Sequence, residues 1–288
     1  MESVLVLIAA PGSHAIGVTT ADMLRDFGAG SPRWLAKGEA LEVADFAGRD
    51  AAVAELAALP IDVNVVPAAN RRKRLLIADM DSTMIEQECI DELGVMAGIG
   101  DHIKEITARA MRGELDFEGA LKERVKLLKG LDAGIIDTIL RERISFMAGG
   151  RTLIATMKAN GAYTALVSGG FTPFTAKVAA DLGFDENQAN DLIVADGVLT
   201  GEVGYPILGQ QAKLDALRRI SAGLGISTAD ALAVGDGAND LAMIGAAGMG
   251  VALHAKPQVQ AEARYRVNHG DLTALLYLQG YEQSAFRD

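Results

Sequence analysis

Two carboxylates, separated by a single residue, follow an apolar stretch of the chain. They are Asp79 and Asp81, and residues 75–78 before them have the pattern of a buried strand. Their side chains would lie at the carboxyl end of that strand, where open α/β sheets bind ligands. Because residues two apart point the same way, one carboxylate could attack phosphorus while the other moves a proton at the leaving oxygen. Calcium loops contain the same pattern, so other elements must decide its chemistry.

A serine and two glycines follow a second apolar stretch, residues 163–167. The hydroxyl of Ser168 and the backbone N–H groups around Gly169 and Gly170, just before a helix, would suit a phosphate. The alternative is an ordinary strand-to-helix turn in which the serine caps the helix.

A third apolar stretch, residues 231–234, leads into Gly-Asp-Gly-Ala-Asn-Asp at 235–240. The glycines permit a tight turn, so Asp236 would emerge where it can join Asp79 on a hard cation such as Mg²⁺, which prefers oxygen ligands. A turn in which Asn239 or Asp240 caps a helix is the alternative. Lys213 stands in a helical stretch, 211–220, and taken alone it is interpreted as a solvated surface lysine.

The four elements occur in one order, and each supplies a different part of phosphoryl transfer. Together they resemble the four motifs of the haloacid dehalogenase superfamily of phosphohydrolases, over residues 75 to about 280. Within that superfamily, residues 79–88, 111–117 and 121–128 are similar to the phosphoserine phosphatases. The second residue of the first motif is Met80, where that family often has Phe.

The resemblance implies roles for the residues at the strand ends. Asp79 would be the nucleophile that forms an aspartyl phosphate, and Asp81 the acid that protonates the leaving oxygen and then activates water. Mg²⁺ would be held by Asp79, the backbone carbonyl of Asp81 and Asp236. The groups implied to hold or orient the phosphate are Lys213, Ser168, Gly169 and Asn239, with Asp240 tuning Lys213 and the metal site.

The resemblance also implies that a helical cap selects the substrate. Glu88 would face an ammonium group and Arg124 a carboxylate, while Met111 and Phe117 close over the aliphatic part. A bidentate contact from arginine suits a carboxylate well.

The order of strand and helix patterns predicts an α/β fold with a doubly wound, mostly parallel sheet over residues 73–288. Helical spacing predicts a cap inserted at about 86–147, and Asp196-Gly197 between apolar runs predicts a hairpin. Residues 1–72 are expected to form a small α+β domain, similar to the ACT-like amino-acid-binding modules.

Charge and composition restrict the partners of the 288-residue chain. A net charge of −11 gives no global attraction for nucleic acid, and no stretch approaches the length of a membrane span. One cysteine, Cys89, fits a reducing compartment, and Glu2 stands where a signal peptide has a basic start. We expect a cytoplasmic protein with a small-molecule substrate, compatible with a homodimer.

The implied activity is Mg²⁺-dependent hydrolysis of O-phosphoserine, the last step of serine biosynthesis. The core motifs leave open a phosphatase or phosphotransferase acting on another small phosphoester. A third alternative is an amino-acid sensor that uses residues 1–70. An ion-pumping ATPase is excluded by the absence of apolar stretches long enough to span a membrane.

Overall fold

A six-stranded parallel sheet forms the centre of the computed structural model, which describes residues 2–288 without the side chain of Met111. Met111, expected in the cap wall, is therefore outside the described side chains. The strand order is β12-β11-β10-β5-β6-β7. These strands are β5 (Leu75–Ala78), β6 (Tyr163–Phe171), β7 (Glu186–Asn190), β10 (Ala231–Gly235), β11 (Met249–Leu253) and β12 (Tyr265–Val267).

Helices cover both faces of this sheet because its strands alternate between two apolar clusters. On β5, Leu75 and Ile77 pack with α9 (Gln210–Gly223) and α10 (Leu241–Ala246). Leu76 and Ala78 instead join the cluster on the opposite face. The helices of that face are α7 (Gly150–Ala159), α8 (Thr172–Leu182) and α12 (Ala274–Leu278), and α11 (Pro257–Glu262) follows β11. The predicted doubly wound α/β class is confirmed.

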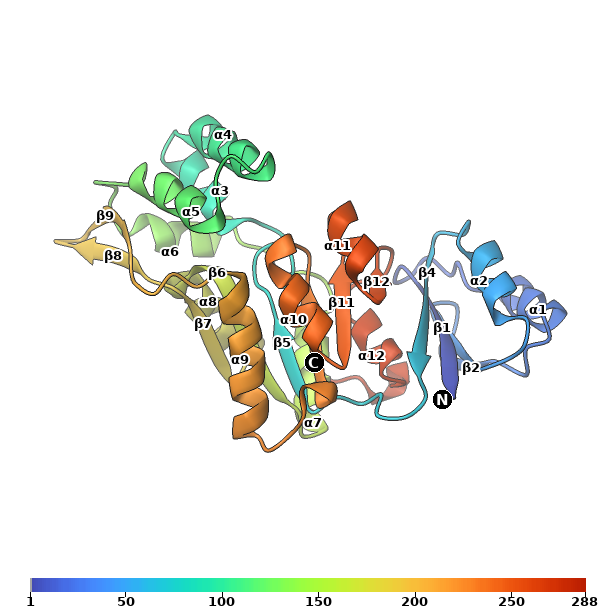
Figure 1. The fold of residues 1–288 in the computed structure, drawn as a ribbon. Coiled ribbons are helices and arrows are strands. Elements are labelled where there is room, and N and C mark those ends of the chain that lie inside the picture. Colours follow the sequence, from blue (N-terminus) through green and yellow to red (C-terminus); the bar gives the residue numbers. More distant parts are fainter. Residues whose placement is uncertain (1) are drawn as a thin grey trace.

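Four helices lie between β5 and α7 and form a cap at one end of the sheet (Figure 1). They are α3 (Cys89–Met96), α4 (Gly100–Met111), α5 (Phe117–Lys126) and α6 (Ile135–Glu142). The predicted hairpin, β8 (Leu192–Ala195) and β9 (Val198–Val203), turns at Asp196 and Gly197, both with positive φ. It is bound to the cap, since Gly130 N–H donates to the Leu199 carbonyl at 2.8 Å.

The N-terminal part is a separate antiparallel sheet, drawn at the right of Figure 1. Its order β2-β3-β1-β4, with two helices, is that of a βαββαβ unit. The elements are β1 (Ser3–Ala9), α1 (Val18–Asp26), β2 (Arg33–Ala36), β3 (Ala40–Ala44), α2 (Arg49–Leu56) and β4 (Ile61–Pro67).

The two faces of this small sheet have different neighbours. Leu5 and Leu7 of β1 pack with residues of α1 and α2, whereas Val6 and Ile8 belong to the same apolar cluster as the main body. The Asp62 carboxylate accepts hydrogen bonds from three consecutive backbone N–H groups, those of residues 268–270. The N-terminal sheet is therefore packed against the main body along one face and one edge strand.

Among residues 2–288, no helix combines the length and the apolar character that a membrane crossing requires. Two short 3₁₀ turns, η1 (Thr228–Asp230) and η2 (Ala238–Asp240), flank β10, and η3 (Gln283–Ala285) lies near the C-terminus.

Candidate active site

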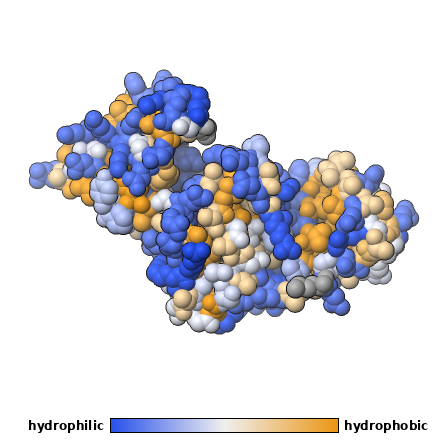
Figure 2. All heavy atoms as spheres, viewed as in Figure 1, coloured by the Kyte–Doolittle hydropathy of each residue, from blue (hydrophilic) through white to orange (hydrophobic). Residues whose placement is uncertain are grey.

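A pocket of about 960 Å³ lies between the carboxyl ends of β5, β6 and β10 and the cap. The space-filling view shows a hollow between cap and body, surrounded by hydrophilic residues (Figure 2). Most of the predicted site residues line it: Asp79, Asp81, Glu88, Phe117, Arg124, Ser168, Gly169, Asp236 and Asn239. Lys213 and Asp240 lie buried beneath its floor.

Lys213 connects two buried carboxylates under the floor. Its ammonium donates to Asp79 Oδ1 and, at 2.6 Å, to Asp240 Oδ1. The solvated-lysine interpretation is wrong, because Lys213 is only 1% exposed. Burial favours its neutral form, but the carboxylates of Asp240 and Asp79 outweigh that effect and raise its pKa. Burial and the Asp240 charge raise the pKa of Asp79, and Lys213 opposes them.

Asp81 is oriented by groups from two directions. The backbone N–H of Cys89, at the start of cap helix α3, donates to Asp81 Oδ1 at 2.9 Å, and Ser168 Oγ lies 3.3 Å from Oδ2. Gly170 N–H donates to Ser168 Oγ at 2.8 Å. A Cβ at Gly170 would stand 2.7 Å from Asp81 Oδ2, so a side chain at this position would displace the Asp81 carboxylate. Burial raises the pKa of Asp81, opposed by the hydrogen bond from Cys89.

Three carboxylates could hold a cation. Asp79, Asp236 and Asp240 each offer an oxygen within 4.8 Å of the others. Asp240 already accepts from Lys213 and, at 3.0 Å, from Gly237 N–H. Burial and the Asp240 charge raise the pKa of Asp236 to about 6. An all-oxygen set of carboxylates matches the preference of Mg²⁺, so these residues fit that ion.

The cap wall brings two opposite charges to the pocket. Glu88 accepts from Ser82 Oγ at 2.8 Å, and Ser82 has the left-handed φ of 54°. Burial and the nearby Asp81 raise the pKa of Glu88 to about 7. The Nε of Arg124 donates to the Ala120 carbonyl at 3.2 Å, and within the described residues no carboxylate oxygen lies within 4.0 Å of its guanidinium. Burial lowers the pKa of Arg124, opposed by Asp91.

Phe117 closes the wall between cap and floor. It is the first residue of α5, whose N-cap Asp116 accepts from Gly119 N–H at 2.7 Å. A Cβ at Gly169 would lie 3.0 Å from its ring, so the ring rests directly on the serine-glycine turn.

The sequence prediction missed Lys256 and the part played by Cys89. Lys256 lines the pocket, with its Nζ 4.0 Å from Asp236 Oδ2. It follows β11, so attention to the carboxyl end of every predicted strand would have suggested it. Cys89 acts through its backbone N–H, for which the residue type gives no signal.

Comparison with known proteins decides the family. The sequence pattern of the haloacid dehalogenase-like hydrolases matches residues 76–245. The chain belongs to this family. The phosphoserine phosphatase of Lactococcus lactis is 44% identical over 204 residues, which are 71% of this chain and 94% of that protein.

Two longer proteins are also similar. The phosphoserine phosphatase of Streptomyces coelicolor is 46% identical over 81% of this chain, which spans only 57% of that protein's length. A crystal structure of a probable phosphoserine phosphatase from Vibrio cholerae, in unliganded form, superposes with a TM-score of 0.81. It is 32% identical and covers 98% of this chain and 88% of its own, so the similarity includes the N-terminal sheet.

Proposed function

We propose that this protein hydrolyses O-phosphoserine to serine and phosphate, with Mg²⁺, through an aspartyl phosphate on Asp79. The observation that carries the proposal is that one pocket combines a floor suited to phosphoryl transfer with a wall that carries two opposite charges. The floor holds the buried Asp79–Lys213–Asp240 cluster, and the cap wall presents Glu88 and Arg124. The Lactococcus and Streptomyces relatives, both named phosphoserine phosphatases, support the same substrate.

The first step transfers the phosphoryl group to the protein. An oxygen of Asp79 attacks phosphorus, and the bond between phosphorus and the seryl oxygen breaks. Asp81 gives its proton to that oxygen, and its raised pKa favours the protonated form that this step needs. Lys213, the Ser168 hydroxyl and backbone N–H groups near Gly169 hold the phosphate oxygens, while Asn239 positions the group.

The second step releases phosphate. Asp81, now ionised, takes a proton from water as the water oxygen bonds to phosphorus, and the bond to Asp79 breaks. Asp79 is thereby restored as a carboxylate and Asp81 as an acid. Mg²⁺, held by Asp79, Asp236 and the Asp81 carbonyl, would supply positive charge that offsets the repulsion between carboxylate and phosphate.

The cap supplies the substrate preference. In this proposal, Glu88 accepts from the ammonium of phosphoserine, and Arg124 binds its carboxylate. Both residues line the pocket, and among the described residues the Arg124 guanidinium has no carboxylate partner. Phe117 covers the aliphatic carbon. Residues 1–72 are proposed as the N-terminal domain and 73–288 as the catalytic body, with 86–147 as its cap.

The test is release of phosphate from O-phosphoserine, phosphothreonine, phosphoethanolamine and a sugar phosphate, with Mg²⁺ or with EDTA. We expect the highest kcat/KM for phosphoserine and loss of activity in EDTA. Faster turnover of the sugar phosphate would contradict the proposal. An alcohol included as acceptor separates hydrolysis from phosphotransfer, since only a transferase would form a new phosphoester.

A further inference from the structure

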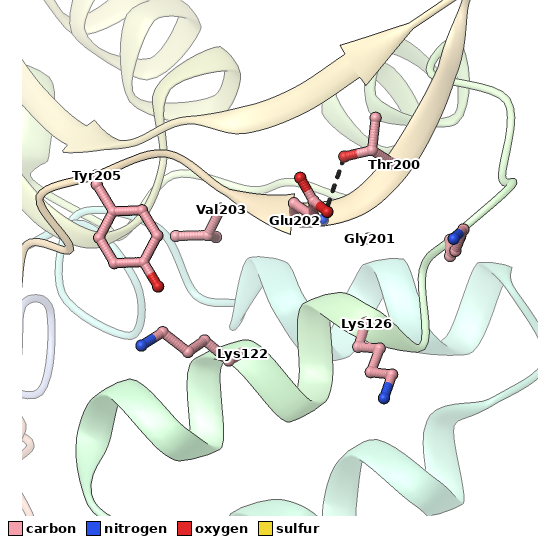
Figure 3. Close-up of a pocket in the computed structure, with 8 residues that line it drawn as sticks. Lys122, Lys126, Thr200, Gly201, Glu202, Val203 and Tyr205 are labelled. Atoms are coloured by element: carbon pink, nitrogen blue, oxygen red, sulfur yellow. Dashed lines mark hydrogen bonds between the residues drawn. The ribbon is translucent and has the colours of Figure 1, made fainter.

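A second groove, of about 560 Å³, lies on the outer side of the cap between α5 and the strand β9. Figure 3 shows Lys122 and Lys126 on the helix side, with Thr200, Glu202 and Tyr205 across from them. Lys129, which also lines the groove, follows the end of α5 by one turn.

The groove is separate from the pocket because it uses the other face of α5. Successive residues of a helix turn by about 100°, so Lys122 and Lys126 lie on one side. Phe117 and Arg124 fall about half a turn away, and both line the active-site pocket, whereas none of the three lysines does. The inference therefore does not rest on the proposed phosphatase activity.

Positive charge is concentrated here in a chain whose net charge is −11. Three lysines line the groove together with one carboxylate residue, Glu202. Lys122 pairs with Glu118 at 3.1 Å and lies over the Tyr205 ring, 5.2 Å from its centroid. For Lys126 and Lys129, the described residues provide no carboxylate oxygen within 4.0 Å. The helix macrodipole accounts for a lysine in the last turn of α5, but not for three around one groove.

The groove also has a fixed shape. Gly201 of β9 packs so closely that a Cβ there would stand 2.8 Å from Lys129 Cβ. The Leu199 N–H donates to the Leu131 carbonyl at 2.8 Å, which ties the hairpin to the turn after α5. The exposed lysine side chains are flexible four-carbon stems on this frame, so their ammonium groups can converge on one anion.

We propose that this groove binds a small anion that carries a diphosphate group, either free or as part of a nucleotide. Two unpaired ammonium groups, one turn apart, suit two neighbouring phosphoryl groups. The exposed Tyr205 ring and the Thr200 hydroxyl offer further contacts to a larger molecule that carries the same group.

The test uses the full-length protein in EDTA, with pyrophosphate and ADP as the probes. Calorimetry compares K126Q/K129Q with K37Q/K177Q, which removes the same charge from exposed lysines outside the groove. We expect K126Q/K129Q to bind pyrophosphate about tenfold more weakly than the control variant, from the loss of two ion pairs. Because the active site also offers cations, acetylation of lysines followed by mass spectrometry locates the site.

Pyrophosphate should slow acetylation of Lys126 and Lys129 and leave Lys37 and Lys177 unchanged. Tighter binding of ADP than of pyrophosphate would support the proposal and indicate that the natural ligand is a nucleotide. Equal affinity for the two would support the proposal and indicate that the ligand is free diphosphate. Equal affinity of pyrophosphate for the two double variants, or unchanged acetylation of Lys126 and Lys129, would overturn it.

Discussion

The floor and the cap wall of the pocket carry their charges differently. On the floor, the Lys213 ammonium donates to both Asp79 and Asp240, and Asp240 accepts a further backbone hydrogen bond from Gly237. On the wall, within the described part of the chain, Arg124 donates to a single backbone carbonyl and Glu88 accepts from a single serine. Both wall residues are largely buried, which disfavours their charged forms.

This difference separates two tasks. A floor whose side chains are held by hydrogen bonds to one another keeps its geometry without a ligand, as preorganised electrostatic catalysis requires. A wall whose charged groups have few partners is stabilised most when a ligand of complementary charge binds. Changes to the floor should therefore affect every substrate alike, and changes to the wall should affect substrates according to their charged groups.

The largest effect is expected for Asp79→Asn on the floor. The amide keeps the size of the side chain but lacks the attacking charge, so phosphate release should fall by at least about 10³-fold for phosphoserine and phosphoethanolamine alike. Steady-state phosphate release measures this. Circular dichroism provides the control for folding. Turnover near that of the unchanged protein would refute Asp79 as the nucleophile.

A smaller and more selective effect is expected for Arg124→Ala on the wall. Loss of a buried contact between guanidinium and carboxylate should cost phosphoserine about 2 to 4 kcal/mol in kcat/KM. Phosphoethanolamine has the ammonium but no carboxylate, so its kcat/KM should fall much less. The ratio of the two kcat/KM values is the measurement.

Lys122→Ala is a matched control for Arg124→Ala, because it removes a cation from the same helix on the face away from the pocket. It should leave that ratio unchanged. If Arg124→Ala lowers kcat/KM for both substrates by the same factor, Arg124 binds the phosphate or stabilises the fold. The contrast between wall and floor then disappears.

Local pattern was enough to predict the buried strands and the polar residues at their carboxyl ends. β5 and β10 are continuous apolar runs with buried residues, and β5 begins and ends at the predicted residues. β7 is the polar run Glu-Asn-Gln-Ala-Asn and β12 has three residues, so neither edge strand has an apolar pattern to find. In the N-terminal domain, β2 and β3 are short and lie in a charged segment, so they too lack a clear strand pattern.

Contacts between distant residues were beyond local pattern. Lys213 and Asp79 are 134 positions apart, and only the family motif assigned them to one site. The β8–β9 hairpin is attached to the cap by backbone hydrogen bonds near residues 130 and 199, and no side-chain type indicates such bonds. The ionisable residues at strand ends are thus predictable from sequence, whereas the distant partners that determine their charge states are not.

The smallest expected effect concerns the charge of Glu88 and is seen in stability. Its pKa is raised from 4.5 to about 7 in the folded protein, so the folded state binds its proton more tightly than the unfolded state. Its contribution to stability is therefore fully present below about pH 4.5 and is lost as the pH rises through about 7. Glu88→Gln keeps a neutral group of similar size and should remove this dependence.

Thermal unfolding in EDTA, between about pH 5 and pH 8, measures the effect of Glu88→Gln without a contribution from metal binding. The variant should match the unchanged protein near pH 5 and exceed its Tm by a few degrees near pH 8. Glu55→Gln, on the exposed surface of α2, is the control and should show a Tm difference independent of pH. A constant difference for Glu88→Gln as well would mean that Glu88 keeps an ordinary pKa. Burial would then not disfavour the Glu88 carboxylate, and the proposed preference of the wall for an ammonium group would need another explanation.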